Sequence, residues 1–285
     1  MWRNLRILLE MIKFEHTIFA LPFAYTGAFL AAGGWPTPRQ ALLILGAMVG
    51  ARTAAMTFNR IVDLPFDAEN PRTRTRPLVT GEVKLRDAWI LFLTSVLFFF
   101  LCTWGLNPLA FKLSPIALGV TLAYSYTKRF TWLCHVFLGL AIGLAPLAGW
   151  VAVKGSLAFL PVVLSLGVLF WVAGFDILYA CLDEEYDRRR GLHSIPAKFG
   201  RKRAFSISAL FHTMAFGLFA MVGVLAHLSW AYYLGLAVTL VLFVAQRVVI
   251  SPDDLSRLDL SFFTFNGAIS VVLFLGTAIA LCFKF

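Results

Sequence analysis

Two groups of polar residues have the types and spacing of ligands for a divalent cation. The first group repeats every four residues and consists of Asn59, Asp63 and Asp67. The second has spacings of three, four and four and consists of Asp176, Tyr179, Asp183 and Asp187. Hard oxygen ligands suit Mg²⁺, which keeps several waters and joins carboxylates to substrate phosphates. We therefore expect the two groups to converge on shared divalent cations.

Both groups stand at the ends of long apolar segments, where ionisable side chains are costly and commonly mark a functional site. Residues spaced by three or four share one face of a helix, so each group predicts a single polar face. Pro65 falls inside the first group and predicts a bend or an end of the helix there. The alternative is a solvated helix end with surface ion pairs, but two matching groups in an acid-poor chain favour the metal site.

Basic residues near these groups fit a bound diphosphate, which needs cationic partners besides a metal. Arginine offers a planar fork for phosphate and lysine a point charge. The candidates are Arg72, Arg76, Lys128 and Lys198. The known excess of Lys and Arg on the cytoplasmic side of membrane proteins is a competing explanation for each of them.

Arg52 is a different case, because it lies inside an apolar segment and topology does not explain it. It precedes Asn59 by seven residues, which is roughly 10 Å deeper on the same helical face. We expect it to bind a carboxylate or another anionic group of a substrate. A buried ion pair with Asp176 or Glu15 is the alternative.

The amino-acid composition indicates that the chain is embedded in a membrane. The chain has 285 residues, of which 60% are hydrophobic and 14% are charged, and its mean hydropathy is +0.80. A soluble domain could not bury so much apolar surface, so we predict an all-helical polytopic membrane protein. The net charge of +10 then reflects membrane topology, and no nucleic-acid partner is expected.

Nine apolar stretches are long enough to be read as membrane spans. We predict spans at 16–34, 40–58, 88–106, 109–126, 133–153, 157–178, 204–225, 229–246 and 262–283. An odd number places the termini on opposite sides. The bias of Lys and Arg then puts the N-terminus in the cytoplasm and the C-terminus outside, with few basic residues on the outer side: Arg39, Lys112, Lys154 and Lys284.

Two cytoplasmic loops, about 59–87 and 183–203, are longer and more polar than the other connections. Each loop follows one acidic group and carries basic residues of its own. No domain boundary is evident, so residues 1–285 are expected to form one domain.

Several segments resemble the UbiA superfamily of intramembrane aromatic prenyltransferases. They are Asn59–Asp67, Arg72–Gly81, Tyr126–Arg129 and Asp176–Asp187, in the family's order. The resemblance implies a helical bundle around a central cavity, capped by the two loops. It also implies Mg²⁺ bound to the diphosphate of a polyprenyl donor by Asn59, Asp63, Asp67, Asp183 and Asp187, with Asp176 and Tyr179 facing the cavity.

The resemblance also suggests substrates. Lys128 matches a lysine that contacts the diphosphate, and Arg52 matches an arginine placed near the carboxylate of an aromatic acid. Enzymes that prenylate 4-hydroxybenzoate in quinone biosynthesis are the nearest group. The segments Lys13–Pro22 and Gly191–Pro196, with His193 where many of these enzymes have lysine, resemble a subgroup in which some members are thought to prenylate a dihydroxynaphthoate in the futalosine route to menaquinone.

The expected reaction is electrophilic aromatic substitution, with a second-group carboxylate as a candidate proton acceptor. The chain has 28 Phe, 7 Tyr and 8 Trp residues that are able to stabilise an allylic cation through their faces. We expect an enzyme of a bacterial-type cytoplasmic (inner) membrane, with a lateral opening for the long tail. A cation-coupled transporter and a haem- or chlorophyll-prenylating branch of the same superfamily are the alternatives.

Overall fold

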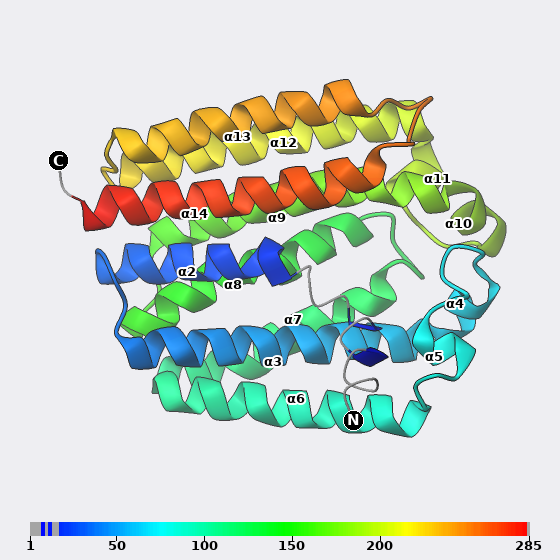
Figure 1. The fold of residues 1–285 in the computed structure, drawn as a ribbon, viewed down its shortest axis with the longest axis horizontal. Coiled ribbons are helices and arrows are strands. Elements are labelled where there is room, and N and C mark those ends of the chain that lie inside the picture. The colour runs from blue at the N-terminus through cyan, green and yellow to red at the C-terminus, as the bar shows by residue number, and fades with distance from the viewer. Residues whose placement is uncertain (1–6, 9–10, 13–16, 284–285) are drawn as a thin grey trace.

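The computed structural model describes residues 7–8, 11–12 and 17–283, and these residues form helices joined by short connections (Figure 1). The described part contains nine helices of 16 residues or more. They are α2 (Thr17–Ala32), α3 (Pro38–Val62), α6 (Leu85–Leu106), α7 (Pro108–Thr127), α8 (Cys134–Lys154), α9 (Phe159–Tyr179), α12 (Arg201–Leu225), α13 (Trp230–Val249) and α14 (Asn266–Cys282).

The long helices pack side by side in two groups. In one group α9 packs on α8 and α12, α2 on α8 and α14, and α13 on α14. In the other, α3, α6 and α7 pack on one another, and contacts of α7 with α8 and of α3 with α2 join the groups. Figure 1 shows α12 and α13 along one edge of the bundle and α6 along the opposite edge.

Local sequence determines where the helices of the second group begin. Thr37 caps α3 in a capping box with Gln40, and Pro38 occupies the first turn, where its missing N–H costs nothing. Asn107 caps α7 by accepting from the amide of Ala110 at 2.9 Å. The Asn107 side chain also donates to the Val151 carbonyl at 2.8 Å. This residue therefore fixes the α6–α7 turn against the end of α8.

The largest apolar core lies within the first group of helices. It includes Phe23, Trp171, Phe219 and Tyr232, all at most 2% exposed. The helices α2 and α8 cross at very short range, because a Cβ on Gly149 would lie 2.0 Å from the Ala24 carbonyl oxygen. Glycine is therefore required at this crossing, as small residues are where membrane helices approach closely.

Seven helices of the described part are long and apolar enough to span a membrane, which corrects the prediction of nine spans. Each predicted range overlaps a helix, but two helices do not qualify. The apolar part of α2 covers only Phe19–Ala32. Helix α7 has sufficient length, but Lys112, two prolines and several hydroxyl residues make it less apolar. The chain has an all-helical polytopic membrane fold.

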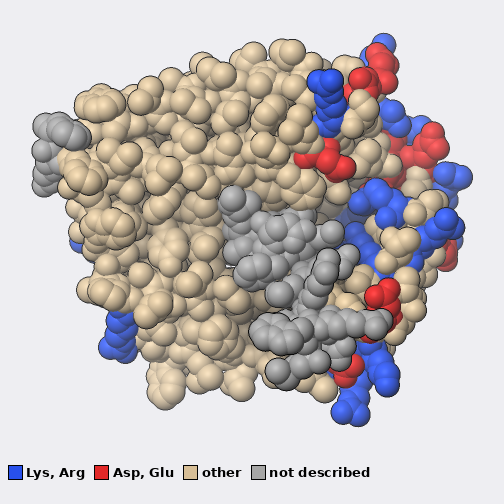
Figure 2. Space-filling view, in the orientation of Figure 1, with Lys and Arg blue, Asp and Glu red and all other residues tan. Residues whose placement is uncertain are grey.

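Five short helical segments form a cap over one end of the bundle (Figure 1). The first cap segment, residues 63–84, contains α4 (Leu64–Glu69) and α5 (Pro77–Thr80). The second cap segment, residues 180–200, contains a 3₁₀ turn (Ala180–Asp183), α10 (Glu184–Arg190) and α11 (Ile195–Phe199). Figure 2 shows that most of the visible charged side chains gather at this end.

The cap also shows how each acidic group is built. Helix α3 ends at Val62 and α4 begins at Leu64, as predicted from Pro65. In the second group Asp176, Tyr179 and Asp183 line one cavity, as a shared face predicts, whereas Asp187 is not among the residues that line it. A 3₁₀ turn separates α9 from α10, and its tighter winding rotates Asp183 and Asp187 relative to Asp176.

Candidate active site

A cavity of about 1120 Å³ lies between the two groups of helices and below the cap. Its cap end is polar and is lined by Asp63, Asp67, Arg72, Arg76, Lys128, Arg129 and Asp183. Its deeper walls are apolar and include Ala47, Met48, Phe99, Leu113, Leu144 and Leu147. The wall also includes three residues that are 37% to 64% exposed, Ile116, Leu140 and Leu157. The cavity therefore joins a charged chamber to an apolar one whose wall includes exposed apolar side chains.

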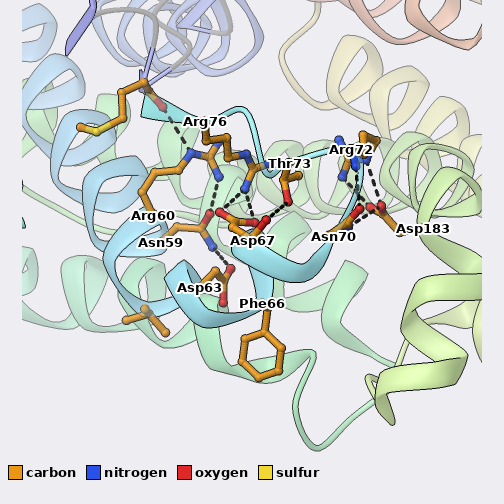
Figure 3. Close-up of polar contacts among 12 residues, drawn as sticks. Asn59, Arg60, Asp63, Phe66, Asp67, Asn70, Arg72, Thr73, Arg76 and Asp183 are labelled. Atoms are coloured by element: carbon orange, nitrogen blue, oxygen red, sulfur yellow. Dashed lines mark hydrogen bonds and ion pairs between the residues drawn. The ribbon is translucent and has the colours of Figure 1, made fainter. Parts of the chain in front are cut away.

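Asp63 stands where α3 gives way to α4, in contact with Asn59 (Figure 3). The Asn59 amide nitrogen donates to Asp63 Oδ2 at 2.8 Å, and the Asn59 carbonyl oxygen accepts from Arg60 Nη1 at 3.0 Å. In this arrangement Asn59 orients the carboxylate of Asp63, and its own oxygen is occupied. Arg129 Nη2 lies 3.4 Å from Asp63 Oδ1 and donates to the Val62 carbonyl.

Asp67 is bound by a cation of its own cap segment. Arg76 Nη1 lies 2.6 Å from Asp67 Oδ1 and 2.5 Å from Oδ2. The Thr73 hydroxyl donates to the Asp67 carbonyl, which folds residues 67–76 into a compact turn (Figure 3). Charge-assisted bonds of this kind are about twice as strong as neutral ones.

Asp183 joins the two cap segments. It accepts Arg72 Nε at 2.9 Å on Oδ1 and Arg72 Nη2 at 2.5 Å on Oδ2. Asn70 also donates to Asp183 Oδ1 at 3.0 Å. All three residues are drawn together in Figure 3. The first cap segment is thereby held against the second by a two-bonded guanidinium–carboxylate pair.

Asp187 lies one layer behind the cavity wall. Its side chain is fully buried, with Lys128 Nζ 2.7 Å from Oδ1 and the Ser194 hydroxyl donating to Oδ2 at 3.0 Å. Lys128 itself lines the cavity. In this structure Asp187 therefore acts on the cavity through Lys128.

The charges of the cap perturb one another in a consistent way. Burial, and then the neighbouring carboxylate of Asp67, raise the pKa of Asp63. Burial lowers the pKa of Arg72 and of Lys128, but the carboxylates beside them outweigh it, so both pKa values are raised. Arg72 and Lys128 therefore remain charged, whereas Asp63 ionises at a higher pH than an ordinary aspartate.

Deeper in the cavity stand three further predicted residues, Asp176, Tyr179 and Arg52. The Asp176 carboxylate lies 2.7 Å from Nδ1 of His135. The Tyr179 hydroxyl accepts from Arg72 Nη1 at 3.4 Å, which links it to the charged chamber. Arg52 lines the wall on α3. Of its two alternative partners, Asp176 is bonded to His135, and Glu15 lies outside the described residues.

Lys198 stands apart from the cavity, in the second cap segment. Lys198 Nζ lies over the rings of Trp132 at 4.7 Å and Phe199 at 5.1 Å, and it is not among the residues that line the cavity. The side chain therefore makes cation–π contacts on the outside of the cap.

Tyr179 lies beside an aromatic wall that the sequence analysis did not locate. Its Phe262 ring lies 4.3 Å from the Tyr179 ring, and both Phe262 and Phe263 line the cavity. They belong to the π-helical segment Leu260–Phe265. Asn266 holds this segment by donating to the Phe262 carbonyl at 3.0 Å and accepting from Trp171 Nε1 at 3.0 Å. The π-helical turn thus places two phenyl side chains in the wall of the chamber.

The donor set at the cap end fits Mg²⁺. Asp63, Asp67 and Asp183 line one cavity and offer only oxygen. Within the described residues, no three His, Cys, Asp or Glu side chains converge as a preformed metal cage. Each acid is instead held by a cation or amide. This matches a metal that binds to one or two carboxylates and completes its coordination with water and substrate phosphates.

Comparison with known proteins agrees with this geometry. The UbiA prenyltransferase family model matches residues 20–268. A 4-hydroxybenzoate octaprenyltransferase of Methylobacillus flagellatus is 34% identical over 228 residues, which are 80% of this chain and 77% of the relative. The structure of an apo UbiA homologue from Aeropyrum pernix K1 superposes with a TM-score of 0.84 at 37% identity, covering 92% of this chain and 96% of that one.

A further solved structure carries ligands. The UbiA homologue from Archaeoglobus fulgidus bound to GPP and Mg²⁺ has a TM-score of 0.74 at 22% identity, covering 95% of this chain and 99% of that one. At this identity the likeness concerns the fold.

Fold and site together define a polytopic helical membrane enzyme whose charged chamber opens into an apolar one. The chain belongs to the UbiA prenyltransferase family.

Proposed function

We propose that this enzyme transfers a polyprenyl group from an allylic diphosphate to an aromatic acid, with 4-hydroxybenzoate as the first candidate acceptor in quinone biosynthesis. One observation carries the proposal. A single cavity contains oxygen ligands and cations at the cap end, Arg52 in its wall, and an apolar extension whose wall includes exposed apolar side chains. These are the complementary surfaces for a diphosphate, a carboxylate and an isoprenoid tail.

The donor diphosphate is placed at the cap end. Asp63, Asp67 and Asp183 would hold Mg²⁺, with Asn59 orienting Asp63 and Asp187 acting through Lys128. Bound there, the metal would neutralise the charge of the diphosphate and stabilise it as a leaving group. Arg72, Arg76 and Lys128 each hold a carboxylate at 2.5–2.7 Å and are able to exchange that partner for phosphate oxygens.

The acceptor is placed below the diphosphate, between Arg52 and Asp176. Arg52 binds its carboxylate, and Asp176 accepts the proton that the ring loses. Phe262, Phe263 and Tyr179 offer aromatic faces to the positive charge that develops on the allylic carbon. The tail lies along the apolar wall towards Ile116, Leu140 and Leu157 and enters from the lipid.

Relatives support both substrates. The Methylobacillus flagellatus relative is named a 4-hydroxybenzoate octaprenyltransferase, and the Archaeoglobus fulgidus homologue was solved with a prenyl diphosphate and Mg²⁺. The charged cap end and the bias of basic residues favour a cap in the cytoplasm, in a bacterial cytoplasmic membrane, with the end of α14 on the opposite side.

The test is a transfer assay in lipid nanodiscs with Mg²⁺, a polyprenyl diphosphate and one acceptor at a time. Product with 4-hydroxybenzoate supports the proposal, and product only with a dihydroxynaphthoate reassigns the acceptor. Absence of product with every aromatic acid rejects it. Asp63→Ala and Asp183→Ala are expected to abolish transfer, whereas the exposed variant Asp87→Asn, at the start of α6, serves as the control.

A further inference from the structure

A buried histidine supports the carboxylate that faces the acceptor chamber. The His135 side chain is 2% exposed, and its Nδ1 lies 2.7 Å from Asp176 Oδ2. Its other nitrogen, Nε2, accepts a hydrogen bond from the amide of Ile195 at 3.3 Å. Because an amide N–H always donates, Nε2 must carry the lone pair and Nδ1 the proton. In this geometry the ring is the neutral tautomer and donates to Asp176 through Nδ1.

The amide that fixes this tautomer belongs to a short segment of the second cap. Three consecutive residues there bond to three parts of the site. The His193 amide donates to the Lys128 carbonyl at 2.7 Å. The Ser194 hydroxyl donates to Asp187 Oδ2 at 3.0 Å, and the Ile195 amide reaches His135. The segment therefore connects the Asp187–Lys128 pair to the Asp176–His135 pair.

We propose that His135 is a positioning residue that holds Asp176 as the proton acceptor of the transfer reaction, and that residues 193–195 join it to the diphosphate end. This inference rests on the proposed function. Asp176 is oriented by one bond on Oδ2, and its side chain is 20% exposed in the cavity wall. A histidine locked from behind by a backbone amide fixes that orientation more tightly than a mobile partner would.

Each bond and proton of the transfer has a defined destination. The C–O bond between the allylic carbon and the diphosphate breaks, and its electron pair leaves with the diphosphate. The aromatic ring supplies the pair for the new C–C bond. The hydrogen at that ring carbon leaves as a proton to the Asp176 carboxylate, and its C–H electron pair restores the aromatic ring. His135 changes neither its charge nor its tautomer.

The experiment compares His135→Leu, which removes both ring nitrogens, with His135→Asn, whose amide still donates to Asp176. Turnover is measured with an acceptor deuterated at the prenylated carbon and with its unlabelled form. We expect His135→Leu to lower kcat about 100-fold and to show a primary isotope effect on kcat, because ring deprotonation becomes slow. His135→Asn should keep kcat near the wild-type value, and affinity for a prenyl thiodiphosphate with Mg²⁺ should not change in either variant.

An unchanged kcat in His135→Leu, a loss without an isotope effect, or an equal loss in His135→Asn overturns the inference. If His135→Leu does not fold, His135→Asn alone is measured. A loss of kcat in His135→Asn then overturns the inference, and a kcat near the wild-type value supports it. The control is His227→Asn, a histidine on the α12–α13 turn, far from the cap.

A readout without turnover separates this inference from the proposed function. In ¹⁵N-histidine NMR spectra, the signal lost in His135→Asn is expected to report a neutral ring protonated on Nδ1. A ring protonated on Nε2 overturns the inference, even if no aromatic acid is a substrate. Failure of all acceptors with the expected spectrum would reject the proposed function alone.

Discussion

Arg72 and Asp183, which lie 111 residues apart in sequence, form two parallel hydrogen bonds across the cap, at 2.9 Å and 2.5 Å. Their pairing holds the first cap segment against the second above the cavity. It also keeps a guanidinium in the chamber where a diphosphate would bind. The two cap segments that carry the acidic groups meet through this pair.

Removing Arg72 should therefore weaken the donor site. We expect Arg72→Ala to raise the KM for the prenyl diphosphate about 10- to 100-fold. This factor corresponds to the loss of charge-assisted hydrogen bonds, which contribute about 1.5–3 kcal/mol. Arg72→Lys should recover only part of this, since lysine cannot form the two parallel bonds. Steady-state kinetics at saturating acceptor measure the effect, and Arg74→Ala, an exposed arginine of the same segment, is the control. Equal effects at Arg72 and Arg74 would contradict the role.

Arg52 should act on the acceptor. Arg52→Ala is expected to raise the KM for 4-hydroxybenzoate by a factor of about 10 to 100, with donor affinity little changed. A phenol without the carboxylate provides the internal control, because the wild type and the variant should use it equally poorly. A selective loss of donor binding would instead assign Arg52 to the diphosphate.

The raised pKa of Asp63 predicts how metal binding depends on pH. Only the ionised carboxylate binds Mg²⁺, and burial together with Asp67 shifts ionisation to higher pH than for an ordinary aspartate. Affinity for Mg²⁺ should thus be full above this raised pKa and fall as the pH drops through it. Calorimetric titration with a prenyl thiodiphosphate present measures this. Asp63→Asn should bind weakly at every pH, and Asp87→Asn should behave like the wild type.

Lys128 should contribute to stability as well as to catalysis. Lys128→Met leaves the fully buried Asp187 without its cation. We expect a loss of about 1–3 kcal/mol in the free energy of unfolding. The loss should lie near the lower end of this range, because the Lys128 side chain is 35% exposed and solvent screens its charge. The double variant Lys128→Met/Asp187→Asn should regain most of this stability but no activity. Thermal unfolding measures this stability. If the single and double variants are equally unstable, Lys128 and Asp187 are not energetically coupled.

The features that the sequence indicated arise from the cost of burying polar groups and from local backbone rules. Carboxylates at the ends of apolar segments indicated the candidate site, and Pro65 indicated the break between α3 and α4. Side-chain partners could not be predicted, because contacts such as Asn70 with Asp183 depend on how the two cap segments dock. His135 gave no signal among apolar neighbours, and the π-helical turn ends beside Asn266, which accepts a long-range hydrogen bond from Trp171.

The span count was mispredicted, and the position of Asp187 differs from the expected one, for local reasons. Helix α2 is apolar over too short a stretch, and α7 carries too many polar residues, so both fall short as spans. A 3₁₀ turn after Tyr179 is not encoded by spacing, and Asp187, which follows it, is the one member of the group that does not line the cavity.

The central claim is that both acidic groups form one Mg²⁺–diphosphate site. The most direct measurement is calorimetric binding of a prenyl thiodiphosphate to the purified enzyme, with Mg²⁺ and with a chelator, in the wild type, Asp63→Ala and Asp183→Ala. We predict tight binding only in the wild type with Mg²⁺, and its loss in either single variant or on chelation. Binding that persists without Mg²⁺, or after one acidic group is removed, would contradict the claim.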